Sequence, residues 1–574
     1  MRADHQEAAL GARKEWLRAG ERASPALTAF IRAQQSDSQA PIALTAPSGR
    51  LVTNPASLPQ IIADFWQDVS KVPGSISTQA RETVLATLRA ADTRLPVEAD
   101  GTVGSPEVTL AEAHAAIKKT QPGKAPGWDG IPADLYKRFW GAIGATMASL
   151  FSAIGATGQP PAGFLEGVIS VLYKKGDPKL PGNYRPITLL CSDYRLLAKV
   201  LANRLGRALG DVITPEQSAF LPRRLIGASI LFLHHLPHLL RKQGQAGIMA
   251  FLDFAKAYDT IDRNFLLAAM EAMGAGPQLR AWTQLLLSGT QARAMVNGYK
   301  SRLVTMEAGV RQGCPLAPIL YLFVAQALLC WLQNQQIGIS LPPTAASQQP
   351  TTVTACQYAD DTEVAIDSEE AVPAFLQAMD TFAQASGQRL NLDKVELLRM
   401  GAQPQQQQQQ DQPPQEPNTI GGLKVVTSAT ALNLPMNNQL EPPQLDWEKM
   451  LTEARRRMQL LARFPLSAFG RSHAASAYGL QMVTWHLEHG GSTAGTTAVT
   501  ELERLTARLV DRRLGPEDRS RRLTGVPSNL LTGHPAHGGF GLLPLHQHLQ
   551  ARQAVWVSRP VSYTHLRAHE TLMN

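Results

Sequence analysis

The sequence predicts an α+β fold, in which short strands carry acidic side chains and long helices pack around them. Two apolar segments, 248–252 and 353–358, have the length and side chains of buried strands. The first runs directly into Asp253, and the second is followed by Asp360 and Asp361. Between and after these segments, apolar residues recur at the three- and four-residue spacing of helices. Because the acidic segments lie far apart in the sequence, only a tertiary fold can bring them together.

Length, charge and cysteine content set broad limits. A chain of 574 residues is long enough for about two to four domains. The net charge of +8 and the pI near 9.3 favour a polyanionic partner without proving one. Four scattered cysteines without a Cys-x-x-Cys pair argue against a disulfide scaffold or a zinc knuckle, and fit a reducing compartment. We find neither an apolar run of about 18 residues nor a signal peptide, so we expect a soluble intracellular protein without a membrane partner.

The first 245 residues divide into two parts. Residues 1–107 are predicted to be helical and modestly amphipathic, with no pattern typical of a catalytic site. Residues 108–245 are punctuated by glycine and proline, and contain strand-like runs at 168–173 and 183–190. A basic turn separates these two runs, which predicts a hairpin.

The predicted hairpin would present three cations, Lys174, Lys175 and Arg185. Cations in this arrangement can grip a triphosphate or a nucleic-acid backbone. An ordinary solvated basic turn is the alternative interpretation, and the hairpin alone does not decide between them.

Residues 246–400 contain the central chemistry. After Asp253, a helix is expected over 262–273. The segment 310–318 contains glycine and two prolines and opens a long apolar helix. Its glycine lets the backbone approach a flat ligand such as a nascent base pair. Strands at 353–358 and 362–366 then form a hairpin with the acidic pair at its turn.

Carboxylates gathered in one place repel one another, and the cluster is costly unless a cation lies between them. Hard oxygen ligands of this kind suit Mg²⁺. Two such ions, about 4 Å apart, can hold the attacking and leaving oxygens of an in-line displacement at phosphorus. Taken alone, the pair Asp360-Asp361 has a plainer explanation, because Asp-Asp is common in surface turns.

The remainder of the chain carries fewer signals. Residues 401–420 are rich in glutamine and proline and are predicted to be a linker. From Trp447 onward the pattern predicts helices, with a basic face at Arg455, Arg456 and Arg457 that can follow a nucleic-acid backbone or simply face solvent. The tail, 561–574, resembles translated adaptor read-through, and we interpret it as non-native.

Taken together, these segments resemble the reverse transcriptase of LINE-type (non-LTR) retrotransposons. The resemblance spans about residues 108–400, with weaker similarity on both sides, and any one of its segments alone would be weak evidence. The segments occur in the family's order: Gly123–Ile131, Asn183–Ile187, Gln217–Phe220, Asp253–Tyr258, Arg311–Pro318, Tyr358–Asp361 and Ser386–Lys394.

The resemblance implies a right-hand polymerase fold. Residues 108–245 would form the fingers, 246–400 a palm with an antiparallel sheet and the catalytic carboxylates, and 421–560 a helical thumb with a C-terminal connection. Residues 1–107 would be a helical N-terminal extension.

The resemblance also assigns roles to individual residues. Asp253, Asp360 and Asp361 would be the catalytic residues and would bind two Mg²⁺ ions, with Mn²⁺ as an alternative. Nucleic acid would contact the basic turn and the basic helix face described above. Around the incoming dNTP, Arg185 would contact the triphosphate and Tyr258 would exclude a ribose 2′-hydroxyl. Gln312 and Gly313 would line the pocket for template and nucleotide, and Lys394 would contact the leaving pyrophosphate. Phe254 is also expected at the dNTP.

The implied activity is RNA-directed DNA polymerisation from a primer 3′-hydroxyl, with dNTPs, an RNA template and a DNA primer or target as partners. In the family, the primer is a nicked chromosomal end, so a nuclear location is expected. Such elements usually carry an endonuclease upstream and often a zinc knuckle downstream, so we expect this chain to be a fragment of a longer polyprotein. Ala317 stands where the family often has serine.

Two other interpretations stay open at this point. The chain can be a truncated or repurposed relative that binds RNA without polymerising, although all three acids are present. It can also be an intron-encoded maturase-type reverse transcriptase, although no clear maturase domain follows the thumb-like region.

Overall fold

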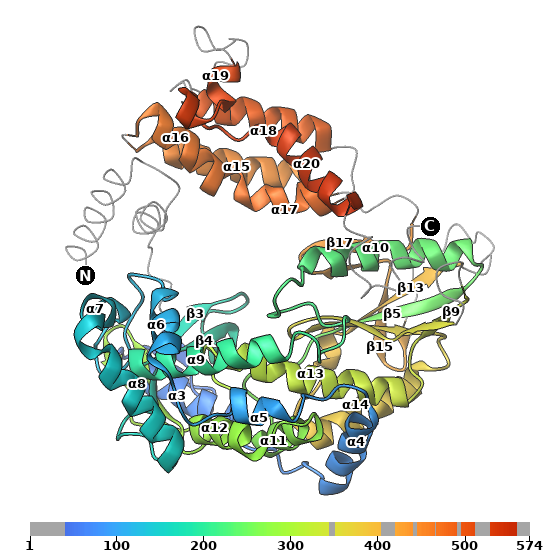
Figure 1. Ribbon diagram of the computed structural model, residues 1–574. Helices are drawn as coiled ribbons and strands as arrows, with labels where there is room; N and C mark the ends of the chain where they lie inside the picture. The colour runs from blue at the N-terminus through green and yellow to red at the C-terminus, as the bar shows by residue number, and fades with distance from the viewer. Residues whose placement is uncertain are drawn as a thin grey trace. The chain divides into compact units, whose positions relative to one another are not determined.

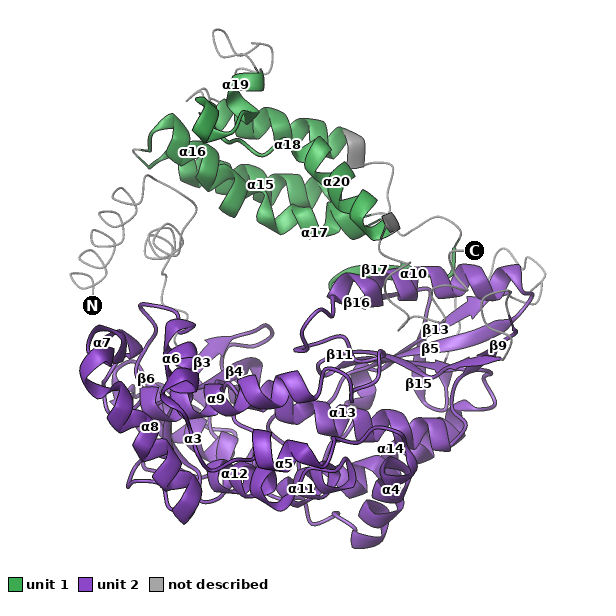
Figure 2. Ribbon diagram, in the orientation of Figure 1, with its two compact units in different colours: residues 1–38, 430–574 green, residues 39–429 purple. Residues whose placement is uncertain are grey.

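The computed structural model describes residues 41–343, 350–402, 419–439, 445–464, 466–490, 495–510 and 528–558. The predicted glutamine-rich linker, apart from its two ends, and the C-terminal tail lie outside these residues, as do the first 40 positions. The chain divides into two compact units, residues 39–429 and residues 1–38 with 430–574 (Figure 2). Figure 1 shows that the larger unit is a mixture of helices and sheets, which confirms the predicted α+β class.

The larger unit is mainly helical outside its sheets. Its α-helices are α3 (Leu58–Val69), α4 (Thr78–Ala90), α5 (Glu98–Val103), α6 (Leu110–Lys118), α7 (Ala133–Arg138), α8 (Trp140–Thr157), α9 (Ser192–Ala208), α10 (Ile226–Lys242), α11 (Arg263–Ala272), α12 (Pro277–Leu287), α13 (Ala317–Asn334) and α14 (Val372–Ser386).

Local sequence explains where several of these helices begin and end. Thr109 and Glu112 form a reciprocal capping box at the start of α6. Asp262 accepts a hydrogen bond from the Phe265 backbone and so begins α11. Gly387, with φ of 81°, ends α14 in the left-handed conformation that glycine adopts without penalty.

A six-stranded sheet carries the aspartates, in the order β11-β12-β5-β13-β15-β14. All neighbouring pairs are antiparallel except β13 with β15. In Figure 1, α10 covers one face of this central sheet, and α13 and α14 lie on the other. The strands are β5 (Ala246–Leu252), β11 (Ala355–Tyr358), β12 (Asp361–Ile366), β13 (Glu396–Gly401), β14 (Thr419–Ile420) and β15 (Leu423–Val426).

A second sheet has the order β4-β3-β6-β7, and β8 also pairs with β6. The predicted basic hairpin is confirmed, because β3 and β4 pair antiparallel. Helix α3 packs against this sheet through the fully buried Trp66. The strands are β3 (Glu166–Tyr173), β4 (Tyr184–Leu190), β6 (Gln291–Val296), β7 (Tyr299–Lys300) and β8 (Val304–Thr305), with the short helix η1 (Pro181–Asn183) before β4.

Two small hairpins complete the unit: β1 (Leu44–Thr45) with β2 (Leu51–Val52), and β9 (Ile339–Leu341) with β10 (Thr351–Val353).

Two expectations about secondary structure were wrong in detail. The predicted strand at 353–358 is divided at Thr354, because β10 pairs with β9 whereas β11 pairs with β12. The resemblance implies a helical thumb from residue 421, but the region begins instead with β15, whose backbone pairs in parallel with β13 in the central sheet. The helices that the structure describes in this region begin at Trp447, where the sequence pattern predicts them.

Helix α13 meets the length and hydropathy of a membrane span, at a mean hydropathy of 1.3, although no such run was expected from the sequence. It is instead a core helix, because 83% of its 18 residues are buried inside the protein. Trp331, on this helix, donates a hydrogen bond to the Ala378 carbonyl of α14.

The smaller unit has its own hydrophobic core, which includes Met458, Leu480 and Leu502. Its described helices are α15 (Trp447–Ala462), α16 (Ala468–Ala474), the π-helical turn η3 (Ala475–Gly479), α17 (Gln481–His489), α18 (Gly495–Val510), α19 (Ser528–Thr532), η4 (Pro535–His537) and α20 (Leu545–Ser558). The sequence position at which the chain divides into its two units falls within β16 (Ser428–Ala431), which forms a hairpin with β17 (Leu434–Asn437).

Candidate active site

Strand register brings the three aspartates together. Strand β5 pairs with β12 so that Leu252 faces Thr362. Continuing this antiparallel register by one residue places Asp253, at the end of β5, opposite Asp361 at the start of β12. Asp360 precedes Asp361 in the tight turn between β11 and β12. Carboxylates separated by about a hundred positions in the sequence are therefore brought to the adjoining ends of the neighbouring strands β5 and β12.

The electrostatics of the three acids reflect this convergence. Burial raises the pKa of Asp360, and Asp253 raises it further, whereas Arg185 and Lys174 lower it. Partial withdrawal from solvent raises the pKa of Asp361 to about 6, and the charges of Asp360 and Asp253 add to this effect. The neighbouring negative charges disfavour ionisation of Asp360 and Asp361, a condition that a bound cation relieves.

The β3–β4 hairpin supplies positive charge to the same place. Arg185 lies on β4 opposite Leu172, and Lys174 follows β3 and donates a backbone hydrogen bond to Asn183. Both cations lower the pKa of Asp360 through their charge. Lys175 lies in the exposed turn beyond them.

Lys394 forms an ion pair with Asp253, with 2.9 Å between Nζ and Oδ2. It lies on the short helix η2 (Leu392–Lys394), and the preceding Asn391 donates a backbone hydrogen bond to the Asp253 carbonyl at 2.8 Å. The predicted pyrophosphate contact is therefore beside the first aspartate, where its ammonium group partly neutralises the carboxylate.

Tyr258 lies next to the acidic pair. Its ring stacks on Tyr321 of α13, with 4.8 Å between ring centroids and 26° between ring planes. Burial raises the pKa of Tyr258, and Asp360 and Asp361 raise it further. Gln388 fixes this arrangement, because its Nε2 donates to the Ala257 carbonyl at 2.7 Å and its Oε1 accepts from the Tyr321 hydroxyl. Gln388 lies in the segment Ser386–Lys394 that resembles the family, but the sequence analysis assigned it no role in the site.

Gln312 and Gly313 lie on a loop that docks onto β4. The Thr188 backbone donates to the Gln312 carbonyl at 2.8 Å, and Gly313 has a φ of 113°. A Cβ on Gly313 would lie 2.4 Å from the Thr188 carbonyl oxygen, so only glycine fits. The Gln312 side chain donates to Asp259 at 2.7 Å. Burial raises the pKa of Asp259 to about 7. Asp259 was not among the site residues predicted from the sequence.

The Phe254 side chain occupies a different environment from the other residues expected at the nucleotide. It is 8% exposed and belongs to the main hydrophobic core. Its backbone bridges to Leu390, which leaves the side chain packed in the protein interior rather than open to a ligand. Alternation along an extended segment explains this, because Asp253 and Phe254 point to opposite faces.

The three arginines of α15 belong to the smaller unit and have acidic partners there. Arg455 pairs with Glu501, and Arg456 and Arg457 both pair with Glu453. The Arg457 guanidinium also lies over the Tyr478 ring, at 4.9 Å. The predicted basic face is thus largely neutralised within its own unit.

The donor set at the central sheet is entirely carboxylate oxygen, which fits a hard divalent cation such as Mg²⁺ or Mn²⁺. Among the described residues, the three ligand atoms that lie within 4.8 Å of one another belong instead to Asp129, Cys191 and Asp193. Burial raises the pKa of the Cys191 thiol to about 11, and the thiol makes a hydrogen bond with Asp129. A protonated, hydrogen-bonded thiol accounts for that cluster without a metal.

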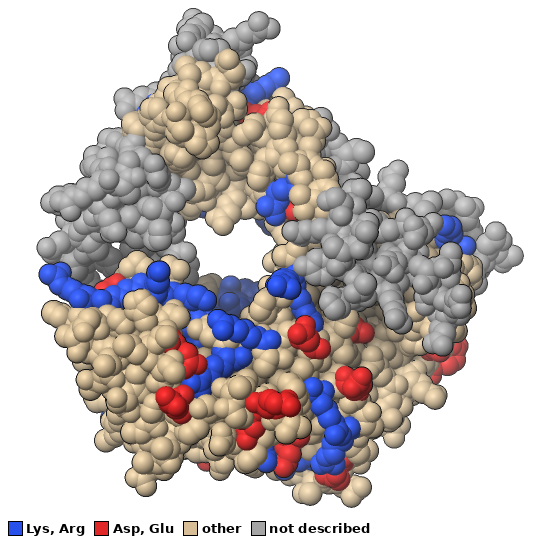
Figure 3. All heavy atoms as spheres, in the orientation of Figure 1, with Lys and Arg blue, Asp and Glu red and all other residues tan. Residues whose placement is uncertain are grey.

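Positive charge also gathers outside the site. Figure 3 shows a band of Lys and Arg side chains across the larger unit over α6 and α9. Exposed cations on these elements and beside them are Lys118, Lys119, Lys124 and Arg207. Such a band suits the phosphate backbone of a nucleic acid.

Residues 173–421 match the family described as reverse transcriptase (RNA-dependent DNA polymerase). The chain is 29% identical over 295 residues to an uncharacterized 149 kDa protein of transposon TX1 from Xenopus laevis, covering 51% of this chain and 22% of that protein. It is 28% identical over 290 residues to a retrovirus-related Pol polyprotein from the type-1 retrotransposable element R2 of Popillia japonica, covering 50% and 38%.

A third relative is the RNA-directed DNA polymerase from mobile element jockey of Drosophila melanogaster. It is 26% identical over 299 residues, covering 50% of this chain and 31% of that protein. The chain spans less than two fifths of each of these three relatives. The matched residues include all three aspartates and the strands that carry them. Residues 173–421 therefore match a reverse transcriptase domain, and the chain is similar to proteins of non-LTR retrotransposons.

Proposed function

We propose that this chain is the polymerase part of a larger retrotransposon protein and copies an RNA template into DNA from a primer 3′-hydroxyl. One observation carries the proposal: the β5–β12 register sets Asp253 against Asp361 and beside Asp360, whose pKa Arg185 and Lys174 of the β3–β4 hairpin lower. Opposite charges arranged in this way suit a metal-bound triphosphate.

Asp253, Asp360 and Asp361 would hold two Mg²⁺ ions, which supply an activated primer hydroxyl and a stabilised leaving pyrophosphate when bound. Arg185 and Lys174 would bind the triphosphate oxygens, since both already act on Asp360. Lys394 would exchange its Asp253 partner for the leaving pyrophosphate, because an ammonium group binds either anion.

Tyr258 would exclude ribonucleotides. The Tyr258 ring would not move aside for a ribose 2′-hydroxyl, because it stacks on the buried Tyr321 and lies beside the aspartates. Gln312 and Gly313 would border the nascent base pair, and the glycine lets the loop lie directly on β4. By this proposal, residues 108–245 are fingers, 246–400 the palm, and the helices from Trp447 the thumb. The partners would be an RNA template, a chromosomal DNA primer and dNTPs, and the site of action would be the nucleus.

Primer extension on a primed RNA template tests this function. The Asp360→Asn variant should reduce dNTP incorporation by about a thousandfold or more, because it removes a metal-binding charge. Asp367→Asn is the matched control, since Asp367 follows the other end of β12 and should leave synthesis unchanged. Thermal unfolding of both variants checks that they fold. Normal extension by Asp360→Asn would refute the site, and RNA binding without extension by the wild type would favour an RNA-binding protein instead.

A further inference from the structure

A buried glutamine outside the aspartate strands holds the turn that carries Asp360. Gln217 lies in the connection between α9 and α10 and is completely buried. Its Oε1 accepts a hydrogen bond from the Ala359 backbone N–H at 3.0 Å, and its Nε2 donates to the Ala359 carbonyl at 3.2 Å. A single side chain therefore binds both polar groups of the Ala359 backbone.

The Ala359 backbone needs such support. Its φ is 61°, the left-handed region that residues with a Cβ rarely adopt. Ala359 immediately precedes Asp360 in the turn, so its backbone angles set the direction in which the Asp360 carboxylate points. If the turn relaxed toward a common conformation, Asp360 would move away from Asp253.

The glutamine is itself held in place. Its Oε1 also accepts from the Ala219 backbone at 3.0 Å, which fixes the amide group in one orientation. Arg224 donates to the Gln217 carbonyl at 2.7 Å and to the carbonyls of Gly210, Ile213 and Thr214. The Gln217 side-chain oxygen and backbone carbonyl are thus both held by residues of the same connection, Ala219 and Arg224. We call the pair of hydrogen bonds between Gln217 and Ala359 the clamp.

The same connection lies along the edge of the central sheet. Strand β11 is outermost in the sheet order, and the Gln357 backbone on it donates to Glu216 at 2.8 Å and accepts from Ser218 at 3.0 Å. The bridge between Gln217 and Gln357 is parallel, so the segment extends the sheet by a short pairing. The clamp is therefore anchored to the strand that leads into the turn.

We propose that Gln217 is a positioning residue for DNA synthesis: it fixes the Ala359 turn so that the Asp360 carboxylate stays aligned with Asp253. The proposal rests on the polymerase function above, and goes beyond it by assigning a role to a residue that contacts no substrate. Its loss should disturb metal binding and turnover, because a displacement of about 1 Å near the reacting atoms is enough to slow catalysis strongly.

The test compares Gln217→Met with Gln326→Met in the full chain. Gln326 is an equally buried glutamine whose Oε1 accepts from the Thr214 backbone at 3.0 Å, at the start of the same connection, without touching the Ala359 turn. Three quantities are measured: thermal unfolding, kcat and KM for dNTP incorporation, and Mn²⁺ binding followed by electron paramagnetic resonance.

Both variants should lose similar stability, since each removes buried hydrogen bonds. Only Gln217→Met should lower kcat, by about ten- to a hundredfold with KM for dNTP little changed, and weaken Mn²⁺ binding several-fold. If Gln217→Met does not fold, the same measurements are made on Gln217→Glu. This variant keeps an acceptor for the Ala359 and Ala219 backbone N–H groups but loses the side-chain donor to the Ala359 carbonyl.

Equal effects in the Gln217 and Gln326 variants, or unchanged kcat and Mn²⁺ affinity in the Gln217 variant, would overturn the assignment. Absence of DNA synthesis by the wild type would instead refute the proposed function. The Mn²⁺ titration needs no turnover, so it would still decide whether Gln217 positions Asp360.

Discussion

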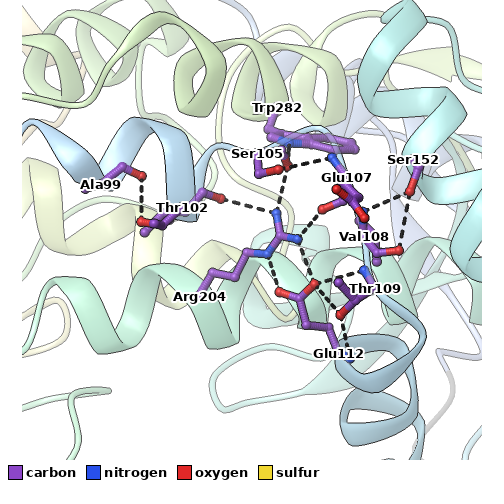
Figure 4. A network of polar contacts seen from close by, with 11 residues as sticks. Ala99, Thr102, Ser105, Glu107, Val108, Thr109, Glu112, Ser152, Arg204 and Trp282 are labelled. Carbon is purple, nitrogen blue, oxygen red and sulfur yellow. Dashed lines mark hydrogen bonds and ion pairs between the residues drawn. The ribbon is translucent and has the colours of Figure 1, made fainter.

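Arg204 joins the helices before the β3–β4 hairpin to α9, and its removal should destabilise the larger unit measurably. Figure 4 shows its guanidinium group at the centre of a polar network. Nε and Nη2 donate to Glu112 at 2.6 and 2.9 Å, and the same group donates to the carbonyls of Ser105 at 2.8 Å and Glu107 at 2.5 Å. The Arg204 side chain is 9% exposed and the Glu112 side chain 33%.

The Arg204→Met variant keeps the aliphatic stem but leaves these acceptors without their cation. A hydrogen bond to a charged group contributes about 1.5–3 kcal/mol, and breaking a buried ion pair costs about 3–5 kcal/mol. Because Glu112 is partly open to water, we expect the lower part of this range, about 3 kcal/mol. The corresponding fall in Tm is about 3–6 °C for a unit of this size.

Chemical unfolding followed by far-UV circular dichroism measures this loss. Arg207→Met, one turn further along α9 at an exposed position, is the matched control and should change stability by less than about 0.5 kcal/mol. A double-mutant cycle with Glu112→Gln isolates the ion pair from the carbonyl contacts. A loss below about 1 kcal/mol in Arg204→Met would refute the reasoning, since it would mean that water replaces the guanidinium at these acceptors.

The pair also predicts a pH dependence. Hydrogen bonds from Arg204 lower the pKa of Glu112 to about 2 from an ordinary value of 4.5. A carboxylate whose pKa is depressed by folding stabilises the protein above its unfolded pKa. This stabilisation is therefore present at neutral pH and is lost as the pH falls from about 4.5 toward 2. The Arg204→Met variant should lose less stability over this window than the wild type does.

Three further variants test the nucleotide site and the basic band. Gly313→Ala should lower Tm by several degrees and raise KM for dNTP about tenfold or more, because its Cβ would lie 2.4 Å from the Thr188 carbonyl oxygen; an unchanged KM would show that the loop does not border the nucleotide. Tyr258→Ala should increase ribonucleotide incorporation at least tenfold relative to dNTP, and unchanged selectivity would exclude the tyrosine as the gate. Reversing Lys118 and Lys119 to Glu should weaken RNA binding and flatten its salt dependence by about 0.7 per lost phosphate contact on a single strand, whereas an unaltered slope would place the RNA elsewhere.

The sequence by itself determined the local features of the site. Asp262 begins α11 and Gly387 ends α14, as the capping rules require. The apolar run before Asp253 forms a fully buried strand from Gly247 onward, and the basic hairpin pairs as expected. These features depend on short stretches of chain, in which side-chain type and spacing decide the backbone conformation.

Tertiary structure decided which of these local pieces meet. The β5–β12 register places Asp253 against Asp361, and a shift by one residue would turn the aspartates to opposite faces. The Lys394–Asp253 ion pair and the clamp of Gln217 on Ala359 join residues more than a hundred positions apart. Strand β15 is held by pairing with β13 across the linker, against the helical expectation for that region. Long-range pairing and packing set these contacts, and no periodicity within a short window records them.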